Sequence, residues 1–155
     1  MKKLLVPVDG STASLNALRK AIEIAQEQNY MIKIVSVVEA KDVSRHRRLE
    51  RLWINEDRLD RDNEPGERLK RGTMELLDAI EERINFHGVH HEREIVSGEA
   101  HEEILRIAED ENIDMIVIGN RGFSKVRRFF LGSVAQRVIS EARCPVLVIH
   151  TEADI

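Results

Sequence analysis

Five short apolar runs recur along the chain, and stretches with helical periodicity lie between them. The runs cover residues 3–8, 31–38, 93–98, 114–119 and 145–150. Most are apolar at consecutive positions, which is typical of strands that are covered on both faces. This alternation predicts a parallel sheet whose strands are joined by helical crossovers.

The helical stretches repeat their core-facing residues every three or four positions, so that these residues share one face of each helix. The positions are Leu15, Leu18, Ile22 and Ala25; Leu69, Thr73, Leu77, Ile80 and Ile84; Ile104, Ile107 and Ala108; and Val134, Val138, Ile139 and Ala142. We expect an α/β fold, a three-layer α/β/α sandwich around an open five-stranded parallel sheet of Rossmann-like type. The expected strand order is 3-2-1-4-5, and we expect residues 1–155 to form a single domain.

The composition is that of a folded globular protein, with 42% hydrophobic and 34% charged residues among 155. No apolar run approaches the roughly 20 residues that span a bilayer, and the apolar part before Pro7 is too short for a signal peptide. A single cysteine argues against a disulfide framework, and a net charge of −4 disfavours a general nucleic-acid binder. We therefore expect a cytoplasmic protein with no membrane insertion and no nucleic-acid partner.

The segment 41–72 is the irregular part of the chain, and more than half of its residues are charged, with both signs present. We expect a solvated helix or a mobile loop within the domain. The basic cluster at 45–48 leaves open a contact with phosphate or RNA.

Two glycine-containing exits follow predicted strands: Asp9 and Gly10 after the first, and residues 119–122 after the fourth. In open parallel sheets ligands bind at the carboxyl ends of strands, where the strand order reverses, and the expected order makes these exits neighbours. The second exit opens the pattern G-x2-G-x9-G-S, which ends at Gly132 and Ser133. Glycine permits positive φ and close approach of the main chain, and a helix N-terminus attracts phosphate. The pattern indicates a two-part phosphate grip or, alternatively, a loop with a Gly-Ser helix cap.

Asp9 could accept hydrogen bonds from ribose hydroxyls or help to hold a metal ion. It could also cap the next helix, with Ser11 and Thr12 as rivals. Pro7 forfeits a ladder hydrogen bond, which is tolerable near the end of a strand. There it could present an apolar face to a purine ring, and a purely structural role is equally compatible with the sequence.

Three stretches and the glycine pattern resemble the universal stress proteins, in particular their ATP-binding type. KKLLVPVDGSTAS resembles the family's first strand and aspartate, EEILRIAEDENIDMIVIGNRG its third helix and fourth strand, and LGSVAQRVISEARCPVLVIH its closing helix and strand. The family motif G-x2-G-x9-G-[ST] is present in full. The resemblance covers nearly the whole chain and implies an adenine nucleotide alpha hydrolase-like fold. Ala100 stands where the family often has proline, and 41–72 follows no family pattern.

The resemblance implies a site for ATP, with Mg²⁺ or Mn²⁺ as candidate companion ions. The implied contacts to adenine and ribose are Pro7, Val8, Asp9, Val37, Ile118 and Gly119. The implied contacts to the phosphates are Gly122, Gly132, Ser133 and Val134. Family members that lack these glycines generally do not bind ATP.

No catalytic residue and no protein metal site is predicted. The sequence lacks the patterns G-x4-GK[ST], G-x-G-x-x-G and G-x-S-x-G. Leu105 stands where a zincin helix starting at His101 needs its second histidine. Cys144 has no legible histidine partner, so we expect a small buried residue rather than a nucleophile.

The leading hypothesis is a nucleotide-dependent regulatory module of the stress response. In it, ATP changes how ordered the loop 120–131 is and thereby changes a surface for an unknown protein partner. The first alternative is a slow ATPase or nucleotidyl-transfer enzyme that uses Asp9, Ser133 and the cations at 125–128. The second is a protein-interaction module without nucleotide. The last strand, 145–150, forms an apolar sheet edge, and the resemblance implies a homodimer through it.

Overall fold

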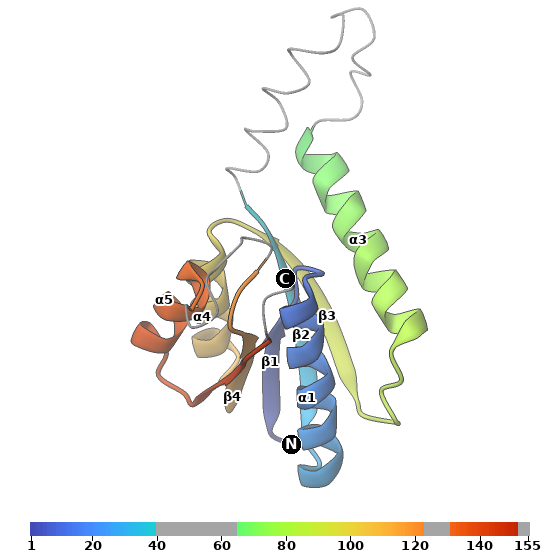
Figure 1. The fold of residues 1–155 in the computed structure, drawn as a ribbon, viewed down its shortest axis with the longest axis vertical. Coiled ribbons are helices and arrows are strands. Elements are labelled where there is room, and N and C mark those ends of the chain that lie inside the picture. Colours follow the sequence, from blue (N-terminus) through green and yellow to red (C-terminus); the bar gives the residue numbers. More distant parts are fainter. Residues whose placement is uncertain (40–64, 123–130, 152–155) are drawn as a thin grey trace, which may run out of the picture.

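Five parallel strands form one sheet in the order β3-β2-β1-β4-β5 (Figure 1). The computed structural model describes residues 1–39, 65–122 and 131–151. The elements are β1 (Lys3–Pro7), α1 (Thr12–Gln28), β2 (Met31–Val38), α3 (Pro65–Arg83), β3 (His91–Ser97), α4 (Ala100–Asp110), β4 (Met115–Gly119), α5 (Ser133–Glu141) and β5 (Val146–Ile149). The predicted α/β fold and strand order are confirmed, and each strand falls within two residues of its predicted run.

Helix α3 begins at Pro65, so the last part of the segment 41–72 is helical, which is one of the two forms expected for it. Proline suits the first turn of a helix, where its missing N–H would have no partner. Glu67 in the first turn and Arg83 in the last turn complement the helix dipole. The part of the segment before Pro65 lies outside the described residues. Neither α3 nor any other described helix is long and apolar enough to cross a membrane.

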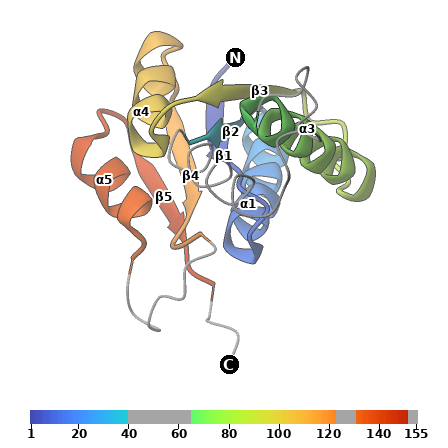
Figure 2. The same cartoon turned by 90° about the horizontal axis from the view of Figure 1, so that it is seen from above.

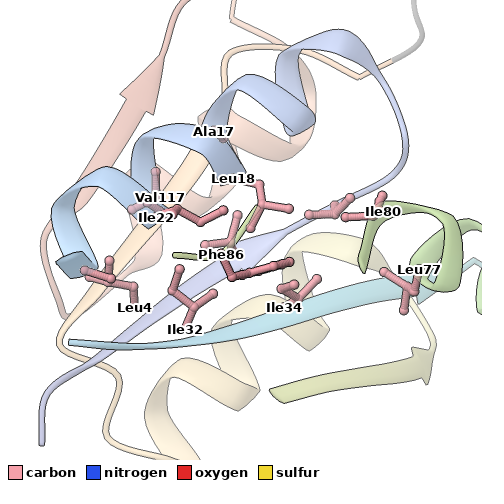
Figure 3. Close-up of a cluster of buried hydrophobic side chains, with 14 residues drawn as sticks. Leu4, Ala17, Leu18, Ile22, Ile32, Ile34, Leu77, Ile80, Phe86 and Val117 are labelled. Atoms are coloured by element: carbon pink, nitrogen blue, oxygen red, sulfur yellow. The ribbon is translucent and has the colours of Figure 1, made fainter. Parts of the chain in front are cut away.

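Helices α1 and α3 cover one face of the sheet, and α4 and α5 cover the other (Figure 2). Successive side chains of β1 point to opposite faces of the sheet. Leu4 therefore packs into the cluster beneath α1 and α3, and Leu5 packs into the cluster beneath α4 and α5. Figure 3 shows the first cluster, in which Leu18 of α1 and Leu77 of α3 join Ile32 of the sheet. The apolar runs are therefore continuous because both faces of each inner strand are buried.

The two ladders that flank β1 differ in length. β1 pairs with β2 along its whole length, from Lys3 to Pro7. Its register with β4 ends at Leu5, opposite Ile116. The strand order reverses between β1 and β4, and the carboxyl ends of these two strands do not pair with each other. An open α/β sheet would take a ligand at this place.

A charged side chain lies buried on the inner strand β2. Lys33 is 9% exposed in its side chain, and its Nζ lies 2.7 Å from Glu94 Oε2 of β3 and 2.7 Å from Glu111 Oε2 at the end of α4. Burial lowers the pKa of Lys33, but the hydrogen bonds to Glu111 and Glu94 outweigh it and raise that pKa above its ordinary value. The ammonium thus ties β2, β3 and α4 together.

We expect Lys33→Ala to lower the free energy of unfolding by about 2 kcal/mol, because two carboxylates lose a buried partner but keep some contact with water. Lys20→Ala, which removes the exposed ion pair with Glu23, should lower it by less than about 0.5 kcal/mol. Because the folded-state pKa of Lys33 is raised, its contribution is complete below the ordinary lysine pKa and is lost as the pH rises through the folded value. Urea denaturation at neutral pH measures both variants, and equal losses would contradict this expectation.

Candidate functional site

Strand β1 delivers Asp9 to the carboxyl edge of the sheet on a firmly held main chain. The Val8 N–H donates to the Val35 carbonyl at 2.8 Å, and the Val8 carbonyl accepts from the Ser36 hydroxyl at 2.6 Å. Asp9 follows directly, and its Oδ1 accepts from the Ser11 N–H at 2.9 Å. The exposed carboxylate is therefore oriented by its own turn.

Ser11 caps helix α1. The Ser14 N–H donates to Ser11 Oγ at 3.2 Å, and the Ser14 hydroxyl donates to the Ser11 carbonyl at 2.9 Å. The same Ser14 hydroxyl accepts from the Asp9 N–H at 3.3 Å. Of the three candidates for this cap, Ser11 is the one observed, so the interpretation of Asp9 as the helix cap is wrong.

The end of β4 lies directly against the first turn of α1. A Cβ at Gly119 would stand 2.8 Å from the main-chain carbon and oxygen of Ala13. Glycine is required here because strand and helix approach too closely for any side chain. None of Gly119, Gly122 and Gly132 has a positive φ. The expectation that the glycines of the motif adopt a positive φ is therefore wrong. Close approach of the main chain remains as the reason for glycine at these positions.

The two exits meet, as the strand order requires. A Cβ at Gly122 would lie 2.7 Å from Asp9 Oδ2. Asp9 and Gly122 are far apart in the chain, and the neighbouring strands β1 and β4 bring them into contact. The bare glycine leaves the carboxylate accessible, whereas a side chain at Gly122 would displace it.

Helix α5 starts at Ser133, with Gly132 as its N-cap and no side chain capping it. The Gly-Ser pair therefore starts the helix as the alternative expects, with Gly132 as the cap and Ser133 as the exposed first helical residue. The Gly132 N–H donates to the Asn120 carbonyl at 2.7 Å, and a Cβ at Gly132 would lie 3.2 Å from Arg121 Cα. The positive end of the α5 dipole thus lies beside the glycine turn, where it can receive an anion.

The other predicted site residues contribute main chain at this edge. Pro7 ends β1 and is half-buried. The side chains of Val37, Ile118 and Val134 pack into or against the cluster beneath α4 and α5. The side chains of these three residues are thus wholly or partly engaged in the core.

The sequence patterns do not predict the contacts of Ala13 and Ser14 or the role of Asn120. Asn120 is 3% exposed, and its Oδ1 accepts from the Thr151 N–H at 3.0 Å. The available signal was an amide side chain directly after an apolar strand, because a buried amide needs partners. Of the predicted loop cations, those at 125–128 lie outside the described residues.

The described residues also include a cysteine thiol and a group of three possible metal ligands. Burial raises the pKa of the half-buried Cys144 thiol, which disfavours the nucleophilic thiolate. The ligand atoms of Glu99, His101 and Glu102 lie within 4.8 Å of one another, a grouping that the sequence spacing did not predict. They sit at the N-terminus of α4, where the helix dipole opposes a cation.

The chain is similar to known proteins over nearly its whole length. A family model described as the universal stress protein family matches residues 1–150. A universal stress protein of Methanocaldococcus jannaschii is 37% identical over 150 residues, covering 96% of this chain and 81% of that protein. YxiE of Bacillus subtilis is 31% identical over 148 residues, covering 96% and 98%.

Solved structures agree in fold. UspA from Lactobacillus plantarum superposes with a TM-score of 0.74 at 27% identity, covering 96% of this chain and 97% of that one. An Arabidopsis thaliana family protein solved with AMP bound has a TM-score of 0.64 at 19% identity, covering 99% and 94%. A universal stress protein in complex with cAMP has a TM-score of 0.59 at 21% identity, covering 96% of each chain.

We expect Gly119→Ala to lower the free energy of unfolding by about 2 kcal/mol, because the new methyl group must push α1 away from β4. Gly72→Ala is the matched control, since a Cβ at this helical glycine meets nothing within 4 Å. It should raise the free energy of unfolding by about 0.5–1 kcal/mol. Urea denaturation measures both, and a neutral Gly119→Ala would show that helix and strand can separate at no cost.

Proposed function

The chain belongs to the universal stress protein family, and from this we propose that it binds ATP at the carboxyl ends of β1 and β4 and acts as a nucleotide-dependent regulatory module of the stress response. The observation that carries the proposal is the meeting of Asp9 with Gly122 beside the N-terminus of α5. Asp9 supplies a carboxylate that can accept hydrogen bonds from hydroxyl groups, and the start of α5 supplies N–H groups that attract an anion. The relatives solved with AMP and cAMP support an adenine nucleotide.

Electrostatics orients the nucleotide in this proposal. The Asp9 carboxylate repels phosphate and accepts hydrogen bonds, so it suits the ribose hydroxyls. The first N–H groups of α5 and the Ser133 hydroxyl suit the phosphates. Gly122 and Gly132 let the phosphate chain pass close to the main chain. The nucleotide would therefore run from Asp9 towards Ser133.

The base would lie against main-chain groups of the inner strands. Pro7 and Val8 lie at the end of β1, Val37 near the end of β2, and Ile118 and Gly119 at the end of β4. Peptide N–H and carbonyl groups can read the edge of a purine without a dedicated side chain. For this reason, the side chains at these positions say little about which base is bound.

A divalent ion, Mg²⁺ or Mn²⁺, would arrive with the triphosphate. Asp9 Oδ1 already accepts from Ser11, and Oδ2 is the remaining carboxylate oxygen that the described loops place beside Gly122. Mg²⁺ commonly binds through phosphate oxygens, water and one or two carboxylates. The residues therefore fit an ion held chiefly by the nucleotide, and its charge would offset that of the phosphates.

A regulatory role is favoured over an enzymatic one, because hydrolysis needs a group that positions water near the terminal phosphate. Asp9 is the carboxylate that the described loops place beside Gly122, and the proposed orientation engages it with the ribose. The proposed setting is the cytoplasm, and the signal would pass to a protein partner. A slow ATPase or nucleotidyl transferase and a nucleotide-free interaction module are the alternatives that the next experiment separates.

Purified protein that is denatured and analysed by chromatography should release ATP or ADP, whereas Gly122→Val should release less than about a tenth as much. The valine side chain would occupy the space beside Asp9 Oδ2 and the phosphate path. Gly72→Ala serves as the control and should release as much as the parent. Added ATP at about 100 times its Kd should stabilise the parent by about 2.7 kcal/mol.

Release of nothing, together with no rise in Tm on adding ATP, would contradict nucleotide binding and favour the interaction module. Sustained multiple-turnover hydrolysis that Asp9→Ala abolishes, with the fold intact, would favour the enzyme.

We also propose a homodimer through β5, the last strand in the sheet order. The Pro145 and Ile149 carbonyls accept from Ile116 and Asn120 of the β4 side. Because peptide groups alternate along a strand, Val148 directs its N–H to the free edge. All four residues of β5 are only partly buried in the single chain, so an apolar edge is left to be covered.

Val148→Pro should convert the dimer to a monomer in sedimentation experiments at micromolar concentration, because it removes an outward N–H without touching the β4 ladder. Circular dichroism should show an intact fold. A parent that sediments as a single chain would contradict the dimer, and a variant that stays dimeric would place the interface elsewhere.

A further inference from the structure

The ladder between β4 and β5 changes its acceptor at Asn120. The Asn120 N–H donates to the Ile149 carbonyl at 3.0 Å, as the parallel register requires. The next regular bond would run from the Thr151 N–H to the Asn120 main-chain carbonyl. Instead the Thr151 N–H donates to the Asn120 side-chain Oδ1 at 3.0 Å. The main-chain carbonyl accepts from the Gly132 N–H at 2.7 Å.

We propose that Asn120 is a positioning residue for the nucleotide site: its side-chain carbonyl takes the place of its main-chain carbonyl in the sheet, and the main-chain carbonyl is thereby available to hold the start of α5. The proposal rests on the proposed function, since it names the residue that sets the distance between the glycine turn and the helix N-terminus.

Because Asn120 is buried, it is important that each of its two carbonyls keeps its own hydrogen-bond donor. Asn120 is 3% exposed, so water cannot replace a lost partner readily. Thr151 is also held by α1, because Asn16 Nδ2 donates to Thr151 Oγ1 at 3.0 Å. Asn120, directly after β4, therefore connects the start of α5 with the chain that follows β5, and Thr151 extends this connection to α1.

The chemistry restricts which side chains could serve at position 120. The side chain must be short and must carry an acceptor at the distance of a carbonyl oxygen, which asparagine and aspartate both supply. With alanine, the Thr151 N–H would lose its side-chain acceptor, and the one carbonyl left at position 120 would have to accept from Thr151 and Gly132 with a single geometry. The start of α5 would then lose its tie to the glycine turn, or the ladder would lose its last bond.

The first test needs no substitution. In the labelled, nucleotide-free parent, couplings across hydrogen bonds should connect the Thr151 amide nitrogen to the side-chain carbonyl carbon of Asn120, and the Gly132 amide nitrogen to its main-chain carbonyl carbon. A Thr151 coupling to the main-chain carbonyl carbon instead would overturn the proposal.

The second test compares variants. In Asn120→Ala, amide exchange at Thr151 or Gly132 should accelerate about tenfold, and the Kd for ATP should rise about tenfold. Asn120→Asp should restore slow exchange at both amides. Asn16→Ala, which leaves both Asn120 carbonyls in place, should keep the Gly132 exchange rate and hold the Kd within about twofold.

Unchanged exchange at both amides in Asn120→Ala would overturn the proposal. Faster exchange with an unchanged Kd would also overturn it, because Asn120 would then serve the sheet alone. A parent that binds no ATP would overturn the proposed function instead, while the couplings and exchange rates still decide how the two carbonyls are divided.

Discussion

The contact between Gly119 and Ala13 is the constraint on which the carboxyl edge of this sheet depends. Strand β4 ends against the main chain of α1, with no room for a Cβ between them. This approach sets the loop that follows β1 beside the loop that follows β4. The meeting of Asp9 with Gly122 follows from it, because both residues come within three positions of these strand ends.

The edge combines two opposite electrical preferences within a short distance. Asp9 presents a carboxylate, and α5 presents the positive end of its dipole beside Gly132. A ligand with hydroxyl groups at one end and negative charge at the other satisfies both, whereas a simple anion would satisfy only one. A nucleotide has this polarity, and its direction in the site follows from the charges rather than from shape alone.

Buried polar groups form specific bonds between elements that the apolar clusters hold only by non-directional packing. Lys33 links β2, β3 and the end of α4 through two carboxylates. Asn120 links β4, α5 and the chain after β5 through its two carbonyls. In a medium of low dielectric constant such bonds are costly to leave unmade, so they select one arrangement of elements among those that bury similar apolar area.

Local patterns along the chain are enough to predict the layers, the parallel sheet and the start of α5 at the Gly-Ser pair. These features depend on local periodicity and on the spacing of glycines along the chain. The folded chain shows which atoms meet: Ser11 caps α1, Ala13 requires glycine at position 119, and Asn120 divides its carbonyls between the chain after β5 and the start of α5. Each of these depends on main-chain geometry or on the approach of distant segments, which periodicity does not encode.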